Sequence, residues 1–232
     1  MANKRFCRLS GQQCELWHNH AVVQPASREP GRPPAAKAAE TRKRILRAAC
    51  EVFSERGYDA ATFQAIAIRA DLTRPAINHY FANKRVLYWQ VLDETNSAVV
   101  AASVQRARGA TTLTGQVSAF IEGAIDSDIE NPTAAAFLIT ATLESQRHPE
   151  LSRPGTDSVS TTRAFLLWAI NDGIQRGELD ANTDAAALTE MLLAVLLGVG
   201  FYAGFIGSRH ELDPVTDQLK LLLARSLTRR PD

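Results

Sequence analysis

Apolar residues recur every three or four positions along most of this 232-residue chain, which is the period of an amphipathic helix. No run alternates in the way that a half-buried strand does. Pro and Gly residues divide the pattern into separate segments. We therefore expect an all-α protein, with helices near residues 38–57, 62–70, 74–80, 84–107, 112–130, 132–147, 157–176, 184–207 and 214–229.

Residues 62–85 predict two short helices, a tight turn between them and the start of a third helix. In the first helix Phe63, Ile66, Ala67 and Ala70 share one face. Short polar residues stand where N-caps belong, immediately before each of the three helices: Thr62, Thr73 and Asn83. This organisation is typical of a helix-turn-helix, although an ordinary helical hairpin has the same pattern.

The second short helix has an outward face that suits contact with DNA. Asp71 lies in the turn, where a short polar residue tolerates a left-handed backbone. Pro75 lies in the first turn of the helix, where its missing N–H costs nothing. Leu72 and Ile77 point back to the first helix, so Arg74, Asn78 and His79 are left facing outward. In a helix-turn-helix, this second helix enters the major groove.

Charge is distributed unevenly, although the net charge is only +1. Residues 1–110 hold 17 Lys and Arg against 9 Asp and Glu, whereas residues 111–232 hold 9 against 16. A basic N-terminal half is the electrostatic footprint of a DNA-binding domain, and chance asymmetry is the alternative. Lys84 follows Asn83 in the first turn of the third helix, where a cation suits a phosphate better than the helix dipole.

One family combines these features in the same order. The motif residues are Thr41-Arg-Lys-Arg-Ile-Leu-Arg-Ala-Ala, Phe53-Ser-Glu-Arg-Gly57-Tyr58, Thr62-Phe-Gln-Ala-Ile66-Ala67, Ala70-Asp-Leu-Thr73 and Ile77-Asn-His-Tyr80-Phe81-Ala-Asn-Lys84. This run of about 50 residues resembles the DNA-binding domain of the TetR family of bacterial transcriptional regulators. Asp71 stands where the family usually has Gly, and Asn78 where an aromatic residue is common.

The resemblance implies which residues meet DNA. Those expected to face base edges are Thr73, Arg74, Pro75 and Asn78, with Arg74 to guanine as the strongest specifying contact. Those expected at phosphates are Thr62, Gln64, His79, Tyr80 and Lys84. Arg42 and Lys43, in the first half of the helix at 38–57, suit phosphates as well. Core packing is the alternative for Tyr80.

The C-terminal helices predict a subunit interface. Residues 191–207 carry no charge and contain four glycines, and they are too short for a membrane span of about 20 residues. A helix that is apolar all round is buried all round, so we expect it to pair with the helix at 214–229 in a four-helix homodimer interface. The candidate interface residues are Leu192, Val195, Val199, Leu219, Leu222 and Leu223. TetR-like regulators also dimerise through their last two helices.

The helices between, roughly 88–205, are expected to enclose a ligand pocket. Large aromatic side chains are the candidate lining residues, with core packing as the alternative for each: Trp89, Phe120, Phe137, Trp168, Phe201, Tyr202 and Phe205. As a set they favour an apolar or aromatic ligand. Glu144 and His148 could hold a metal ion, but a surface pair is favoured. We expect neither a metal nor a cofactor.

These observations predict three regions and one function. Residues 1–36 form a disordered or basic arm, 37–83 the helix-turn-helix domain, and 84–230 a helical regulatory and dimerisation domain. We expect a cytoplasmic homodimer that represses transcription from a palindromic double-stranded DNA operator until a small molecule releases it, with no membrane partner. The rivals are a dimeric DNA-binding protein without an effector and an enzyme. An enzyme is disfavoured because no phosphate loop, nucleophile elbow or metal-spaced cluster occurs.

Overall fold

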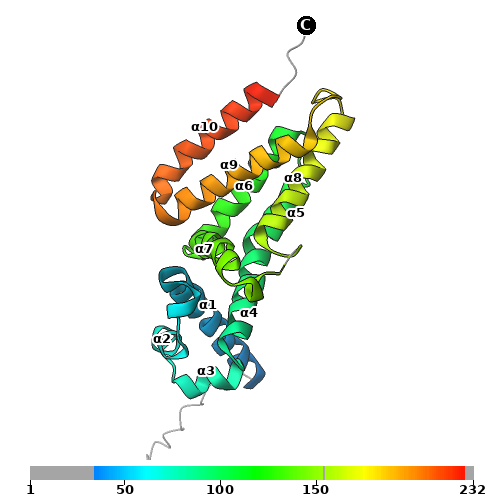
Figure 1. Cartoon of the computed structure of the whole chain (residues 1–232). Helices are drawn as coiled ribbons and strands as arrows, with labels where there is room; N and C mark the ends of the chain where they lie inside the picture. Colours follow the sequence, from blue (N-terminus) through cyan, green and yellow to red (C-terminus); the bar gives the residue numbers. More distant parts are fainter. Residues whose placement is uncertain (1–33, 154, 228–232) are drawn as a thin grey trace, which may run out of the picture. The chain divides into compact units, whose positions relative to one another are not determined.

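A computed structural model describes residues 34–153 and 155–227, and every regular element in these ranges is a helix (Figure 1). The predicted all-α class is confirmed. The chain divides into two units, residues 1–37 and 38–232, and the description below concerns the second. The predicted N-terminal arm, except for residues 34–36, lies outside the described residues.

The helix-turn-helix segment consists of three helices, α1 (Pro34–Ala60), α2 (Phe63–Arg69) and α3 (Arg74–Tyr80). The apolar stripe of α1 is buried, with Ile45 and Ala49 fully enclosed. Gly57 interrupts α1 with a φ of 71° and a ψ of 177°. The break falls at the residue that the sequence predicts as the helix end, and one more turn follows it.

The predicted long helix at 84–107 is continuous but not uniform. It comprises α4 (Lys84–Asn96), a π-helical turn η1 (Ser97–Ala101) and α5 (Ala102–Ala107). The backbone stays in the right-handed helical region at both joints. Inside this stretch the buried Ser103 hydroxyl donates to the Val99 carbonyl, with 2.5 Å between the two oxygens. The sequence period alone does not distinguish a π turn from an α turn.

The remaining helices form one bundle, in which α9 packs against α7, α8 and α10. They are α6 (Leu113–Glu130), α7 (Ala134–Arg147), the short η2 (Pro149–Leu151), α8 (Ser158–Gln175), α9 (Ala185–Phe205) and α10 (Arg209–Leu227). Helices α7 and α8 pack on α9, and α10 lies along α6 and α9 (Figure 1). Helix α6 packs on α5, which joins the bundle to the chain leading from the helix-turn-helix.

Helix α10 begins five residues before the predicted start at residue 214. Ser208 and Glu211 form one half of a capping box: the Glu211 carboxylate accepts the Ser208 backbone N–H at 2.7 Å and its hydroxyl at 2.8 Å. Asp213 and Pro214 therefore both lie inside the helix. The Ser208-x-x-Glu211 pattern is the sequence signature of this helix start, and it lies before the predicted range of 214–229.

Helix α9 is closely packed on one side and open on the other. A Cβ added at Gly204 would lie 2.8 Å from the Ala136 backbone, so glycine permits the close approach of α9 to α7. A Cβ at Gly198 would meet nothing within 4 Å. Helix α9 is long and apolar enough to cross a membrane, and only 17% of its most apolar 18-residue window is buried. The burial on all sides that its sequence predicts is therefore not reached within one chain.

The C-terminal end of α1 joins α7 through an aromatic core. Phe53 packs edge-on against Tyr88 of α4, with ring centroids 5.0 Å apart, and Phe137 of α7 lies 5.7 Å from Tyr88. The Tyr88 hydroxyl is buried without a hydrogen-bond partner in the described part of the chain. Burial, together with nearby Glu144 and Tyr58, raises the pKa of Tyr88 well above its usual range, so this hydroxyl stays neutral.

A buried carboxylate completes this junction. Glu144 of α7, which is 6% exposed, accepts the backbone N–H of Tyr58 at 3.2 Å. Gly57 brings the two helices this close, because a Cβ at that position would lie 2.6 Å from Glu144 Oε1. The backbone angles of Gly57 are also in a region that only glycine adopts without strain.

We expect Gly57→Ala to destabilise the protein by about 2–4 kcal/mol, because backbone strain and the contact with Glu144 act together. Gly177→Ala is the matched control. Gly177 also has a positive φ, 74°, but nothing lies within 4 Å of an added Cβ, so only the strain of about 1–2 kcal/mol remains. Urea denaturation measures both losses. Equal losses for the two variants would show that the contact with Glu144 contributes nothing.

Candidate functional site

Caps and one left-handed residue set the geometry of the helix-turn-helix. Thr62 Oγ1 accepts the Ala65 N–H at 3.1 Å, and Thr73 Oγ1 accepts the Ala76 N–H at 3.4 Å. Between the two helices, Asp71 has a φ of 52° and is the sole non-glycine residue with a positive φ in the described ranges. Each cap satisfies one of the orphaned amides at its helix start, and the left-handed residue turns the chain between α2 and α3.

Helix α3 has one buried face and one open face. Ile77 is fully buried, whereas Thr73, Arg74, Pro75 and Asn78 are exposed. The four residues predicted to contact base edges thus lie on the solvent side of α3. The side chains of Arg74 and Asn78 bond to no other residue in the described part of the chain, so both are available to a ligand.

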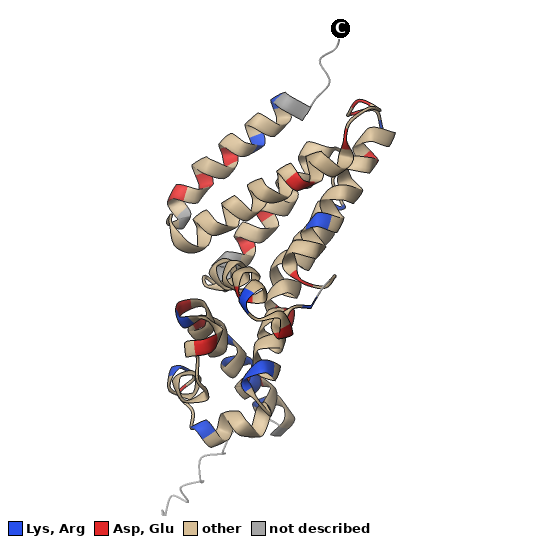
Figure 2. Cartoon of the chain, viewed as in Figure 1, with Lys and Arg blue, Asp and Glu red and all other residues tan. Residues whose placement is uncertain are grey.

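The residues predicted to contact phosphates fall into two groups. Lys43, Thr62, Gln64 and His79 are exposed, while Tyr80 is half-buried and packs against the core. Figure 2 shows basic residues on each helix of the helix-turn-helix and at the start of α4, with acidic residues also on α1, while α10 carries residues of both signs. The exposed group belongs to residues 1–110, where Lys and Arg outnumber Asp and Glu by 17 to 9.

Arg42 and Lys84 form the second group, because their charges are already used within the chain. Arg42 donates to Glu94 at 3.0 Å and to Gln90 at 2.5 Å, which links α1 to α4. The Lys84 ammonium donates to the carbonyls of Tyr58 and Asp59 at 2.7 and 3.1 Å and lies 4.3 Å from the Tyr58 ring centroid. Both side chains therefore brace α4 against α1, a role that the sequence did not indicate.

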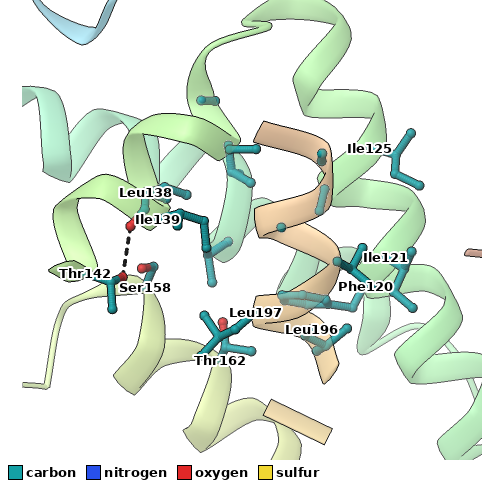
Figure 3. A pocket seen from close by; sticks show the side chains of 18 of the residues that line it. Phe120, Ile121, Ile125, Leu138, Ile139, Thr142, Ser158, Thr162, Leu196 and Leu197 are labelled. Atoms are coloured by element: carbon teal, nitrogen blue, oxygen red, sulfur yellow. Dashed lines mark hydrogen bonds between the residues drawn. The ribbon is translucent and has the colours of Figure 1, made fainter. Parts of the chain in front are cut away.

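A cavity lies inside the helical bundle, with a volume of about 120 Å³. Its walls come from η1, α6, α7, α8, α9 and the start of α10, and they are almost entirely aliphatic. Three hydroxyl side chains, Thr142, Ser158 and Thr162, are the polar side chains among its lining residues. Figure 3 shows these three on one side of the cavity and Phe120, Ile121 and Ile125 on the opposite side.

Most of the aromatic residues predicted to line the cavity lie elsewhere, and the cavity wall is mainly aliphatic. Phe120 lines the cavity. Phe137 belongs to the core that joins α1, α4 and α7, while Trp168, Phe201 and Phe205 are 41–49% exposed. Tyr202 is half-buried outside the cavity wall. Aromatic size alone did not identify the lining, because these side chains also fill the core or cover the surface.

Trp89 lies outside the cavity and joins α4 to the α7–α8 connection. Its indole N–H donates to the Leu151 carbonyl at 3.3 Å. The guanidinium groups of Arg85 and Arg153 lie 5.2 and 4.9 Å from its ring centroid. Arg153 also forms two hydrogen bonds with Asp93 of α4, at 2.9 and 2.7 Å. Trp89 is thus a structural contact between α4 and residues 151–153.

The predicted interface residues on α9 and α10 also separate into two sets. Leu192 and Leu223 are buried within the chain, and Val199 lines the cavity. Val195 and Leu219 are half-buried, and Leu222 is 61% exposed. The exposed stripe of α9 follows a spacing of three and four residues and consists of Met191, Ala194, Gly198, Phe201 and Phe205. Leu192 and Leu223 lie on the opposite side of their helices because they face the bundle.

The predicted surface position of Glu144 is wrong. Its i, i+4 spacing to His148 suggested a surface pair, but Glu144 is buried against Tyr58. His148 Nε2 lies 3.5 Å from Glu144 and 3.2 Å from Asp59. A local pattern cannot show that α1 packs on this face of α7. Among the described residues no cluster of three or more potential ligands is arranged to hold a metal ion.

The fold and the exposed recognition helix define a helix-turn-helix DNA-binding regulator with a helical second region, and comparisons with known proteins agree. Residues 45–91 match the family of bacterial regulatory proteins of the tetR type, and residues 113–228 match the C-terminal region of BetI-type transcriptional repressors. The second match covers half of the chain. The chain belongs to the TetR family of transcriptional regulators.

Individual relatives share this architecture. The HTH-type transcriptional regulator UidR of Escherichia coli strain K12 is 24% identical over 163 residues, which cover 70% of this chain and 81% of UidR. A solved structure on the control of antibiotic production by bacterial hormones is 26% identical and covers 82% of this chain and 98% of its own, with a TM-score of 0.63. The fatty acid degradation regulator FadR of Bacillus halodurans shares the fold, with 19% identity, coverage of 80% and 98%, and a TM-score of 0.65.

The internal role of Lys84 leads to a prediction for stability. Lys84→Ala removes two hydrogen bonds and the contact with the Tyr58 ring, so we expect the free energy of unfolding to fall by about 1–2 kcal/mol. Lys43→Ala is the control, because the exposed Lys43 has no such contacts, and it should leave stability unchanged within about 0.5 kcal/mol. Urea denaturation distinguishes them. A stable Lys84→Ala variant would return Lys84 to the group available for phosphates.

Proposed function

We propose that the protein is a homodimeric repressor that binds a palindromic operator through α3 and is released by a small, mainly apolar molecule in the bundle cavity. The observation that carries the proposal is the pairing of an exposed recognition helix with an aliphatic cavity in one chain. The protein would act by binding rather than by catalysis and work in the cytoplasm. The structure on the control of antibiotic production by bacterial hormones, which is 26% identical, supports small-molecule control.

Base recognition would come from α3. Arg74 can donate two hydrogen bonds to guanine, and Asn78 can pair with adenine through its amide. Thr73 and Pro75 would complete the surface that meets base edges. Lys43, Thr62, Gln64, His79 and Tyr80 would contact phosphates and fix the register. Arg42 and Lys84 would act indirectly, by holding α1 and α4 together under the recognition helix.

Two copies of the chain would meet through α9 and α10. The exposed stripe of α9 contains Phe201 and Phe205, and α10 adds Leu222 and Val215, which is 39% exposed. A helix this apolar gains from burial, and Gly198 leaves space for a partner side chain. A two-fold dimer presents two recognition helices to two half-sites, which explains how one short helix can provide sufficient specificity.

Helix α7 would transmit ligand binding to the DNA side. Its first half forms part of the cavity wall, up to Thr142, and Glu144 two residues later holds the end of α1. The Trp89 contacts tie α4 to the connection that follows α7. A ligand that favours a shifted α7 would therefore change the position of the recognition helix. The ligand acts only through its different affinity for the two arrangements.

DNA recognition is tested with an operator selected from random duplexes by the parent protein. We expect Arg74→Ala to lose about 1–3 kcal/mol of discrimination at one base pair of each half-site. Lys43→Ala should weaken binding to every sequence alike and lower the dependence of log K on log salt by about one. Fluorescence anisotropy at several salt concentrations measures both. If Arg74→Ala discriminated bases as the parent does, α3 would not be placed on the base edges as proposed.

The dimer is tested with a charge on the exposed apolar face of α10. We expect Leu222→Glu to raise the dimer dissociation constant about 100-fold or more, because two unpaired carboxylates would be buried at the two-fold interface, each at a cost of several kcal/mol. Ile68→Glu is the control, since Ile68 is 70% exposed on α2. Sedimentation velocity across a dilution series gives the constants. A Leu222→Glu variant that dimerises like the parent would exclude this face of α10.

A further inference from the structure

The hydroxyl groups of the cavity differ in their hydrogen bonding. Thr142 Oγ1 donates to the Leu138 carbonyl at 2.9 Å, as drawn in Figure 3. Ser158 and Thr162, one turn apart on α8, have no hydrogen-bond partner for their side chains among the described residues. Thr162 is 7% exposed, so bulk water does not readily replace a partner. The buried Thr162 hydroxyl therefore has no hydrogen-bond partner within the described part of the chain, whereas Ser158 is only half-buried.

Other threonines on helices that form the cavity wall have hydrogen-bonded hydroxyls, and Thr162 differs from them. Thr161, its neighbour, donates to the Asp157 carbonyl at 2.8 Å. The buried Thr189 and Thr216 likewise donate to the carbonyls four residues earlier, at 2.7 and 3.2 Å. This local bond is the usual way to satisfy a hydroxyl inside a helix. Thr162 lines the cavity instead, where a bound molecule can supply the missing hydrogen-bond partner.

The charges around the cavity limit what that molecule can be. None of the described lining residues is charged, so no cation is present to neutralise an anionic ligand. The carboxylate of Asp157 immediately precedes Ser158 and is occupied by the Ser160 N–H and hydroxyl. Burial of an unpaired charge in such an aliphatic wall is strongly unfavourable. A single neutral polar group beside α8 is compatible with it.

We infer that Thr162, assisted by Ser158, selects an apolar molecule that carries one uncharged hydrogen-bonding group, such as a hydroxyl or a carbonyl, and rejects the corresponding carboxylate. This inference rests on the proposed function, because it takes the cavity as the effector site. The volume of about 120 Å³ accommodates roughly eight to twelve water-sized groups, which sets the scale of a compact ligand. The apolar body would lie against Phe120 and the aliphatic wall, with its polar end at α8.

Three probes of similar shape test this selection: naphthalene, 2-naphthol and 2-naphthoate. With the full-length protein, calorimetry or ligand fluorescence should show that 2-naphthol binds about three- to tenfold more tightly than naphthalene, which corresponds to one hydrogen bond. Binding of 2-naphthoate should be at least about tenfold weaker than that of 2-naphthol. Failure of 2-naphthol to bind, or equal binding of the naphthoate, would overturn the inference.

Variants of α8 identify the group responsible. Thr162→Val should remove the advantage of 2-naphthol while leaving the affinity for naphthalene at or above that of the parent, which also shows that the variant is folded. Ser158→Ala should reduce the advantage in part. Thr161→Val is the matched control, because Thr161 does not line the cavity, and it should keep the full advantage. An advantage that survives both Thr162→Val and Ser158→Ala would contradict the assignment.

A separate measurement distinguishes failure of this inference from failure of the proposed function. The affinity for the selected operator is measured with and without saturating 2-naphthol. If the probes discriminate through Thr162 but operator affinity is unchanged, the cavity selectivity holds and ligand control of DNA binding by this probe class fails. If operator affinity changes equally with all three probes, the selectivity inference fails while ligand control stands.

Discussion

The attachment of α1 to α7 is the constraint on which the rest of the arrangement depends. One buried carboxylate accepts one backbone N–H there, and a glycine with angles forbidden to other residues lets the two helices approach. The aromatic core around Tyr88 excludes water from this contact, which strengthens it. Helix α7 also forms part of the cavity wall. It thus contacts the end of α1 and the cavity directly.

The neighbouring contacts of α4 reinforce this connection. Lys84 closes the start of α4 onto the last turn of α1, and Arg42 holds its middle. Trp89 and Asn96 bind the connection between α7 and α8, the latter through the Thr156 carbonyl at 2.9 Å. Most of these contacts involve groups that stay charged or polar at the surface, so each is individually modest. Together they position α4 against both α1 and the segment that follows α7.

The sequence predicted the local features well, because they depend on nearest neighbours. The caps Thr62, Thr73 and Asn83, the break at Gly57 and the outward face of α3 are all set within a few residues. The features that depend on which helices meet were not predictable in this way. Glu144, Lys84 and Trp89 each have a partner more than 25 residues away, and the sequence shows their type but not their partner. The same holds for the cavity, whose walls come from helices spread over more than a hundred residues.

The open face of α3 has a consequence for how the protein can change. Arg74, Pro75 and Asn78 lie on the solvent side of α3, whereas the cavity hydroxyls lie on α7 and α8, so the two sets share no contact. Replacement of the outward residues would leave the packing of Ile77 intact. New target sites and new inducing compounds could thus arise in separate steps during evolution, and a designer of biosensors could exchange either specificity while keeping the other.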